Sequence, residues 1–177
     1  MLFRSTEIPV DANLTLGVPG LGTVGEIIGM QLKNKYPNLL IVPFKSSSDA
    51  IVAVLGGQID LTVGFISDLE RYPNLQVLGI TGNNKIKNYL PLSRQGFNQD
   101  LDRMGIKHSV MVPTDWPEGK IREVQEILML AEKSKPVQDS YEPDSCSPFQ
   151  ITRTQLNFWF KEQNQFWTQM VKRIRKD

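Results

Sequence analysis

Two short loops in the sequence carry residue types that can hold a small anion. Residues 20–23 read Gly-Leu-Gly-Thr, and residues 45–48 read Lys-Ser-Ser-Ser. Glycine lets a ligand approach the backbone closely, and free amides at a helix start favour a negative charge. The hydroxyl groups and the lysine add further hydrogen-bond donors. The two loops therefore predict a site for a carboxylate or another small anion, with simple helix capping as the structural alternative.

The elements around these loops are expected to be strands that each lead into a helix. Apolar runs bounded by turn residues predict the strands, and apolar residues at helical spacing predict the helices. Because strands and helices alternate, the predicted fold class is α/β, with a mostly parallel sheet and flanking helices. In such a sheet both loops lie at the carboxyl edge, where ligands bind. The predicted strands are 14–18, 39–44, 59–63, 75–80 and 108–113. Four helices are predicted: one that begins after Thr23, two that span 50–55 and 117–133, and one in the C-terminal region.

The starts of the first two helices have recognisable caps. Thr23 and Glu26 form a T-x-x-E capping box, and Ser48 is expected to cap the second helix. The continuous apolar run 39–44 is typical of a parallel strand covered on both faces. Residues 81–107 lack periodicity and are interpreted as a connection, and residues 135–149 as a loop.

The two C-terminal helices are each expected to bury one face. In the helix 117–133 that face is formed by residues three and four apart. The last helix carries a similar apolar stripe. The residues concerned are Ile121, Val124, Ile127, Leu128 and Ala131 in the first helix, and Leu156, Trp159, Phe160, Trp167, Met170, Val171 and Ile174 in the second.

Composition excludes several functional classes. The 177 residues include 20 Lys and Arg against 19 Asp and Glu, and the formal charge of +1 gives no general attraction for nucleic acid. The longest aliphatic runs are far shorter than the roughly 20 residues that span a bilayer. A single cysteine excludes an intramolecular disulfide and a thiolate zinc cluster. No metal is expected, because the acidic residues near the two loops do not form a ligand cluster, and no cofactor is expected for a binding function.

The residues alone leave other functions open. Residues 20–25 match G-x-G-x-x-G, but Phe44-Lys45-Ser46 stands where a dinucleotide fold needs an acidic residue. Lysine and serine tolerate a 2′-phosphate, so an NADP-linked Rossmann-type oxidoreductase is one alternative. An effector-binding domain of a transcriptional regulator is another. Cys146 and His108 could form a nucleophile and base, although the polar surroundings of Cys146 carry no sign of activation.

Residues 42–60 resemble a pattern found in one receptor family. They read VPFKSSSDAIVAVLGGQID, which is similar to V-P-Y-K-G followed by a variable stretch and L-L-G-G-Q-V-D. The family is the solute-binding receptors of tripartite tricarboxylate transporters, also called Bug receptors. Residues 17–23 are similar to the Gly/Ser loop that opens their second domain. More diffuse similarity covers residues 75–81, 91–96 and 109–117, and Trp167.

The resemblance implies a type II periplasmic binding protein fold that closes about a hinge and performs no catalysis. It implies capture of a small organic acid, such as a di- or tricarboxylate, in the periplasm. Delivery to the membrane components of a tripartite transporter would follow, without nucleic acid or membrane insertion. Residues 11–90 would form the second, ligand-binding domain, 91–107 the crossover, and 108–177 the returning part of the first domain. We expect residues 1–10 to be a scar and leader remnant, with the natural protein and its signal peptide extending upstream.

The sequence departs from the family pattern at four places. Pro19 precedes Gly20, Thr23 replaces a serine and keeps the hydroxyl, and Ser46 replaces the glycine after the lysine. Residues 63–67 contain no acid where the family carries an aspartate that faces the ligand. The candidate ligand-binding residues are Gly20, Leu21, Gly22, Thr23, Lys45, Ser46, Ser47, Ser48 and Phe65.

Overall fold

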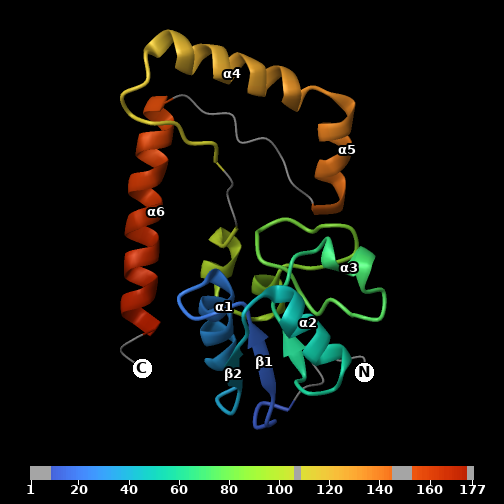
Figure 1. Cartoon of the computed structure of the whole chain (residues 1–177). Coiled ribbons are helices and arrows are strands. Elements are labelled where there is room, and N and C mark those ends of the chain that lie inside the picture. Colours follow the sequence, from blue (N-terminus) through green and yellow to red (C-terminus); the bar gives the residue numbers. More distant parts are fainter. Residues whose placement is uncertain (1–8, 106–108, 145–152, 175–177) are drawn as a thin grey trace. The chain divides into compact units, whose positions relative to one another are not determined.

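The computed structural model describes residues 9–105, 109–144 and 153–174 (Figure 1). The chain divides into two compact units, Met1–Met104 with Ile151–Asp177, and Gly105–Gln150. No helix in the described ranges is both long enough and apolar enough to cross a bilayer.

The first unit contains a parallel sheet with the strand order β2-β1-β3. β1 (Thr15–Val18) is central, β2 (Leu40–Pro43) pairs along its whole length, and β3 (Leu61–Thr62) pairs on the other side. These strands lie within the predicted ranges 14–18, 39–44 and 59–63. The predicted α/β class with a parallel sheet is therefore confirmed.

Helices α1 (Val24–Lys33) and α2 (Ser47–Leu55) cover opposite faces of this sheet. A Cβ added to Gly29 of α1 would lie 3.0 Å from Leu16 Cδ2, and a Cβ added to Gly17 would lie 3.0 Å from Ala50 Cβ of α2. Successive strand residues face opposite sides of a sheet, so Leu16 faces α1 and Gly17 faces α2. The missing side chain at Gly17 lets α2 approach the strand closely.

A second layer packs on the outer side of α1. It consists of α6 (Arg153–Ile174) and the 3₁₀ helix η2 (Gln99–Arg103). The shared core contains Ile27, Ile28, Leu101, Met104, Phe166 and Met170. The apolar stripe predicted for the last helix therefore becomes core in its C-terminal half, whereas Phe160 is 49% exposed.

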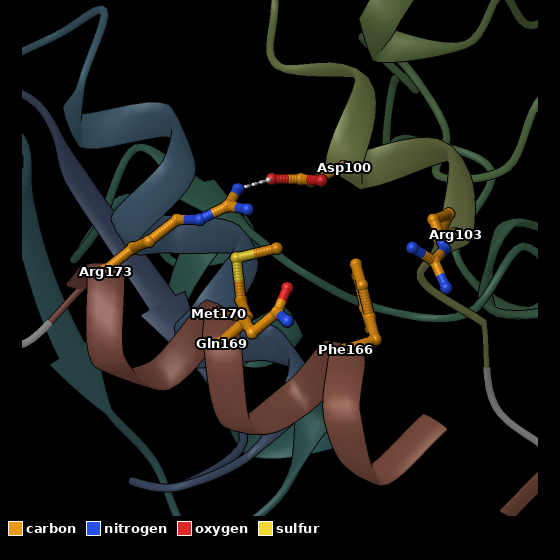
Figure 2. Close-up of a pocket in the computed structure, with 6 residues that line it drawn as sticks. All are labelled: Asp100, Arg103, Phe166, Gln169, Met170 and Arg173. Carbon is orange, nitrogen blue, oxygen red and sulfur yellow. Dashed lines mark hydrogen bonds and ion pairs between the residues drawn. The ribbon is translucent and has the colours of Figure 1, made fainter. Parts of the chain in front are cut away.

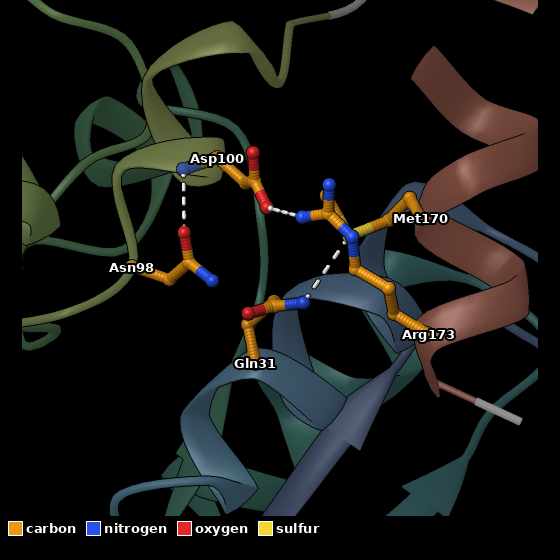
Figure 3. A network of polar contacts seen from close by, with 5 residues as sticks. All are labelled: Gln31, Asn98, Asp100, Met170 and Arg173. Carbon is orange, nitrogen blue, oxygen red and sulfur yellow. Dashed lines mark hydrogen bonds and ion pairs between the residues drawn. The ribbon is translucent and has the colours of Figure 1, made fainter. Parts of the chain in front are cut away.

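Polar contacts accompany this packing (Figure 3). The Arg173 guanidinium donates to the Asp100 carboxylate at 2.9 Å, and Gln31 Nε2 donates to Met170 Sδ at 3.2 Å. Asn98 Oδ1 accepts from the Asp100 N–H at 2.8 Å, which orients the start of η2. The C-terminal half of α6 is thus attached to both α1 and η2.

The second unit contains α4 (Glu118–Glu132) and α5 (Lys135–Asp144). α4 confirms the predicted helix 117–133, but the prediction of a buried face is wrong, because no side chain of α4 is buried among the described residues. Within this unit α4 contacts α5. α5 also replaces the loop predicted from residue 135. The Ser134 carbonyl accepts from the amides of Val137 and Gln138, and a proline near a helix start fits this turn.

Two predicted strands are wrong. The Ile80 N–H donates to the Leu90 carbonyl at 3.1 Å, and the Leu92 N–H donates to the Ile80 carbonyl at 2.9 Å. Residues 75–80 therefore contact the local segment around η1 (Leu92–Gln95) through an isolated bridge, and form no strand. Residues 109–113 are irregular, and His108 lies outside the described residues.

The strand β2 also differs from its prediction. Leu40 is 59% exposed and Pro43 is exposed, so the strand is not covered on both faces. Its position explains the difference, because in the described part of the chain β2 pairs with β1 alone and lies at the edge of the sheet. The apolar run 39–44 carries its strongest burial at Leu39, which is 1% exposed and precedes the strand.

Candidate functional site

Three loops meet at the carboxyl edge of the sheet. The Phe44 N–H donates to the Val18 carbonyl at 2.8 Å, and the Val63 N–H donates to the Gly17 carbonyl at 3.2 Å. The ends of β2 and β3 are therefore aligned with the end of β1. Because neighbouring strands lie about 4.8 Å apart, the outer two loops are about 10 Å apart, a spacing that suits a small molecule.

The strand order identifies the most favourable position along this edge. The chain passes from β1 to β2 on the face of α1, and returns past β1 to β3 on the face of α2. Connections that leave in opposite directions create a topological switch point, where open α/β sheets bind ligands at the carboxyl ends of their strands. Here it lies between β1 and β3. Residues 19–23 and 63–67 flank it.

The first loop is shaped by two glycines and one threonine. Gly20 and Gly22 have φ values of 97° and 74°, which only glycine adopts readily. Thr23 caps α1, as predicted: its Oγ1 accepts from the Glu26 N–H at 3.3 Å. The same hydroxyl donates to the Gly20 carbonyl at 2.9 Å, so its hydrogen is already engaged. Leu21 lies between the two glycines and is 69% exposed.

The Glu26 carboxylate closes the first loop from the other side. It accepts a hydrogen bond from the Gly22 N–H. This completes the capping box, with the backbone donor at Gly22 instead of at Thr23. One amide that an incoming anion could use is therefore occupied by a negative charge of the protein.

The second loop caps its helix with a different serine from the predicted one. Ser46 Oγ accepts from the Asp49 N–H at 3.1 Å, and Ser46 has the extended backbone of a cap residue, with φ −152° and ψ 165°. The prediction for Ser48 is wrong because α2 begins at Ser47, which makes Ser46 the residue before the helix and places Ser48 inside its first turn. Ser48 is exposed in the first turn, and Lys45 is exposed before the cap.

The third loop holds Phe65 by its backbone. The Phe65 N–H donates to Asp68 Oδ2 at 2.8 Å, and Asp68 begins the short helix α3 (Asp68–Arg71). A Cβ on Gly64 would lie 2.8 Å from the same oxygen, so a larger residue there would displace this carboxylate. The Phe65 side chain is 50% exposed. The sequence indicated no acid in residues 63–67, and the fold brings Asp68 back to this loop.

Charge at this edge is more negative than the residues of the two predicted loops suggest. Lys45 is the one lysine or arginine within residues 19–23, 44–49 and 63–68. Asp49 and Asp68 lie within the same segments, and Glu26 bonds to the first loop. Glu26 and Asp68 were not predicted as site residues. Their signal in the sequence is that each lies four residues after a loop glycine, Gly22 and Gly64 respectively.

The hollow drawn in Figure 2 lies elsewhere, between η2 and α6. Its volume is about 40 Å³, enough for little more than one water molecule. The Arg103 guanidinium lies 4.3 Å from the centre of the Phe166 ring, and Arg173 is paired with Asp100. The lining residues are Asp100, Arg103, Phe166, Gln169, Met170 and Arg173. Its size makes it unsuitable for an organic acid.

The possible pair of a nucleophile and a base lies outside the described residues. Cys146 and His108 are not among the described residues. Within the described ranges, no group of three or more His, Cys, Asp or Glu side chains is arranged to hold a metal ion.

Comparison with known proteins identifies the fold through solved structures. No family model and no curated protein matches the chain. A structure described as a periplasmic transporter matches with a TM-score of 0.72 and 19% identity, over 92% of this chain and 56% of the other. A TctC solute-binding protein from Polaromonas, solved without ligand, matches with a TM-score of 0.59 and 14% identity, over 92% and 58%. The periplasmic binding protein fold is thereby confirmed, and the chain spans somewhat more than half the length of each structure.

Proposed function

We propose that the chain is part of a periplasmic solute-binding receptor that captures a small organic acid and delivers it to the membrane components of a tripartite transporter. The observation that carries the proposal is the match to a TctC solute-binding protein over 92% of the chain. The loops after β1, β2 and β3 supply the candidate site at the edge where such sheets bind ligands.

The second loop is the best anchor for a carboxylate. Ser46 Oγ accepts from the Asp49 N–H, which leaves its own hydrogen available to a ligand. The amides of Ser47 and Ser48 lie in the first turn of α2, where backbone N–H groups have no partner within the helix. Lys45 adds a positive charge beside them. Thr23 has a different role, because it holds the first loop in shape and has no hydrogen left to donate.

The proposal includes a division of the chain into parts of two domains. Residues 11–90 would be the ligand-binding domain, 91–107 the crossover, and 108–177 a part of the opposing domain. Support comes from apolar side chains that the described residues leave uncovered, including Ile127 and Leu130 of α4 at 57% and 70% exposure. In a complete receptor, further protein would cover them, and hinge closure would bury the ligand.

A thermal and calorimetric screen tests the proposal. The purified protein is titrated with mono-, di- and tricarboxylic acids, and with NADPH for the oxidoreductase alternative. A ligand present at a hundredfold excess over its Kd stabilises the folded state by about 2.7 kcal/mol, so binding is visible as a higher Tm. Stabilisation by NADPH and by no organic acid would refute the receptor function.

Variants of Ser46 connect the binding to the site. Ser46→Ala removes the hydroxyl and should weaken organic-acid binding, while Ser46→Thr keeps the hydroxyl and should retain most of it. Ser134→Ala is the matched control, because the Ser134 hydroxyl donates to the Ala131 carbonyl at the end of α4 and lies outside the three loops. Equal binding by Ser46→Ala and the unmodified protein would exclude the second loop as the anchor.

A further inference from the structure

We propose that the solute of this receptor carries a single carboxylate on an apolar body, as arylacetic and alkanoic acids do, in place of two or three carboxylates. The inference rests on the proposed receptor function and specifies the class of its solute. Its basis is the combination of exposed apolar side chains and surplus negative charge around the switch point between β1 and β3.

Two exposed apolar side chains flank that switch point. Leu21, 69% exposed, lies in the loop after β1, and Phe65, 50% exposed, lies in the loop after β3. Hydrogen bonds hold both loops: the Thr23 hydroxyl donates to the Gly20 carbonyl and the Gly22 amide to Glu26 on either side of Leu21, and the Phe65 amide donates to Asp68. Removing such side chains from water is favourable, so a ligand with an apolar body gains affinity by covering them.

The charges disfavour a ligand with several carboxylates. Lys45 can neutralise one carboxylate, and the same three segments contain no other lysine or arginine. Glu26 and Asp68 already accept hydrogen bonds from the loop amides of Gly22 and Phe65. A second or third carboxylate on the ligand would meet these negative charges and that of Asp49. A ligand with one carboxylate at Lys45 and Ser46 fits the charge distribution. If the rest of that ligand is uncharged, it can cover the apolar side chains of Leu21 and Phe65.

Isothermal titration with three probes tests the inference. Phenylacetate has one carboxylate and an apolar ring, acetate has the carboxylate alone, and citrate has three carboxylates. We expect phenylacetate to bind at least about tenfold more tightly than either of the other two, which corresponds to about 1.4 kcal/mol. Tighter binding of citrate than of phenylacetate would overturn the inference and leave the receptor function standing. No binding by any organic acid would overturn both.

Side-chain variants test whether Leu21 and Phe65 contact the ligand or another part of a protein. Leu21→Ala and Phe65→Ala should each weaken phenylacetate binding several-fold and leave acetate binding unchanged. Leu55→Ala and Phe158→Ala are the controls, since Leu55 ends α2 away from the carboxyl edge and Phe158 lies in α6. Both control residues are exposed, at 44% and 63%. If Leu21→Ala and Phe65→Ala bind phenylacetate as the controls do, these side chains contact another part of a protein and the inference is wrong.

Discussion

The carboxylate of Asp68 accepts a hydrogen bond from the backbone N–H of Phe65 at 2.8 Å. This contact fixes the turn that presents Phe65 at the carboxyl edge of the sheet. Asp68→Ala should lower the free energy of unfolding by about 1.5 kcal/mol, because a hydrogen bond to a charged acceptor is lost. Urea denaturation measures the change. Asp68→Asn keeps an acceptor and should be less destabilising; equal losses for the two variants would show that the hydrogen bond is not what stabilises the turn.

Glu26 places stability and ligand binding in opposition. Glu26→Ala removes the acceptor for the Gly22 N–H, and loss of a cap of this kind costs about 1 kcal/mol. The same change removes a negative charge from the site and should tighten the binding of anions, citrate most of all. Glu26→Gln keeps an acceptor without the charge, so it should bind anions more tightly at little cost in stability. Unchanged citrate affinity in Glu26→Gln would contradict the electrostatic argument.

The attachment of α6 should depend on packing more than on its ion pair. Met170 is 1% exposed, and Met170→Ala should cost about 2–5 kcal/mol through the lost contacts and the cavity. Arg173 pairs with Asp100, but the arginine side chain is 63% exposed, and Arg173→Ala should cost less than about 1 kcal/mol. Chemical denaturation of both variants, together with Asp100→Ala and the double variant, separates the two contributions. A larger loss in Arg173→Ala than in Met170→Ala would contradict this ranking.

Tyr36 should make the fold sensitive to alkaline pH. Its ring packs beside Phe97 and it is 5% exposed, and burial raises the pKa of its phenol above the ordinary value of 10.0. Below pH 10 the phenol is protonated in both states and contributes no pH dependence. Above pH 10 the unfolded chain ionises first, so the free energy of unfolding should fall until the folded pKa is passed. Denaturation between pH 9 and pH 11 should show a shallower loss for Tyr36→Phe, and identical slopes would rule out this group as the cause.

Hydrogen exchange should distinguish the two units. The described side chains of α4 include none that is buried, whereas α1 buries Ile27 and Ile28. Local opening is easier where few apolar contacts must be broken, so α4 amides should exchange at least about tenfold faster than those of α1. Mass spectrometry of peptides from the two helices measures the rates. Equal protection would mean that α4 is covered by contacts outside the described residues.

The sequence predicts the elements whose signals are local. Thr23 and Glu26 mark the start of α1 because a hydroxyl followed three residues later by a carboxylate has a specific use at a helix terminus. The strands β1, β2 and β3 are also predicted by a local signal, because each is an apolar run bounded by turn residues. The sequence alone therefore places the residues of the first two loops at one edge of the sheet.

The predictions from the sequence are wrong where a segment has several possible hydrogen-bond or packing partners. Residues 75–80 form an apolar run, but the backbone of Ile80 bonds to Leu90 and Leu92 and not to a neighbouring strand. Three consecutive serines could each cap α2, and in the structure Ser46 is the one whose hydroxyl accepts from the Asp49 N–H. Leu101 and Met104 are core residues in a region without extended periodicity, because η2 is too short to show one. The return of Asp68 to Phe65 also depends on a turn that spacing alone does not specify.

The position of β2 at the edge of the sheet has a consequence for how the chain behaves at high concentration. A free strand edge offers backbone groups that can pair with a strand of another molecule and start aggregation. β2 has four residues and ends at Pro43, which has no N–H to donate. Because β2 is short and ends in proline, strands of other molecules should pair with it poorly, and aggregation through this edge should be slow.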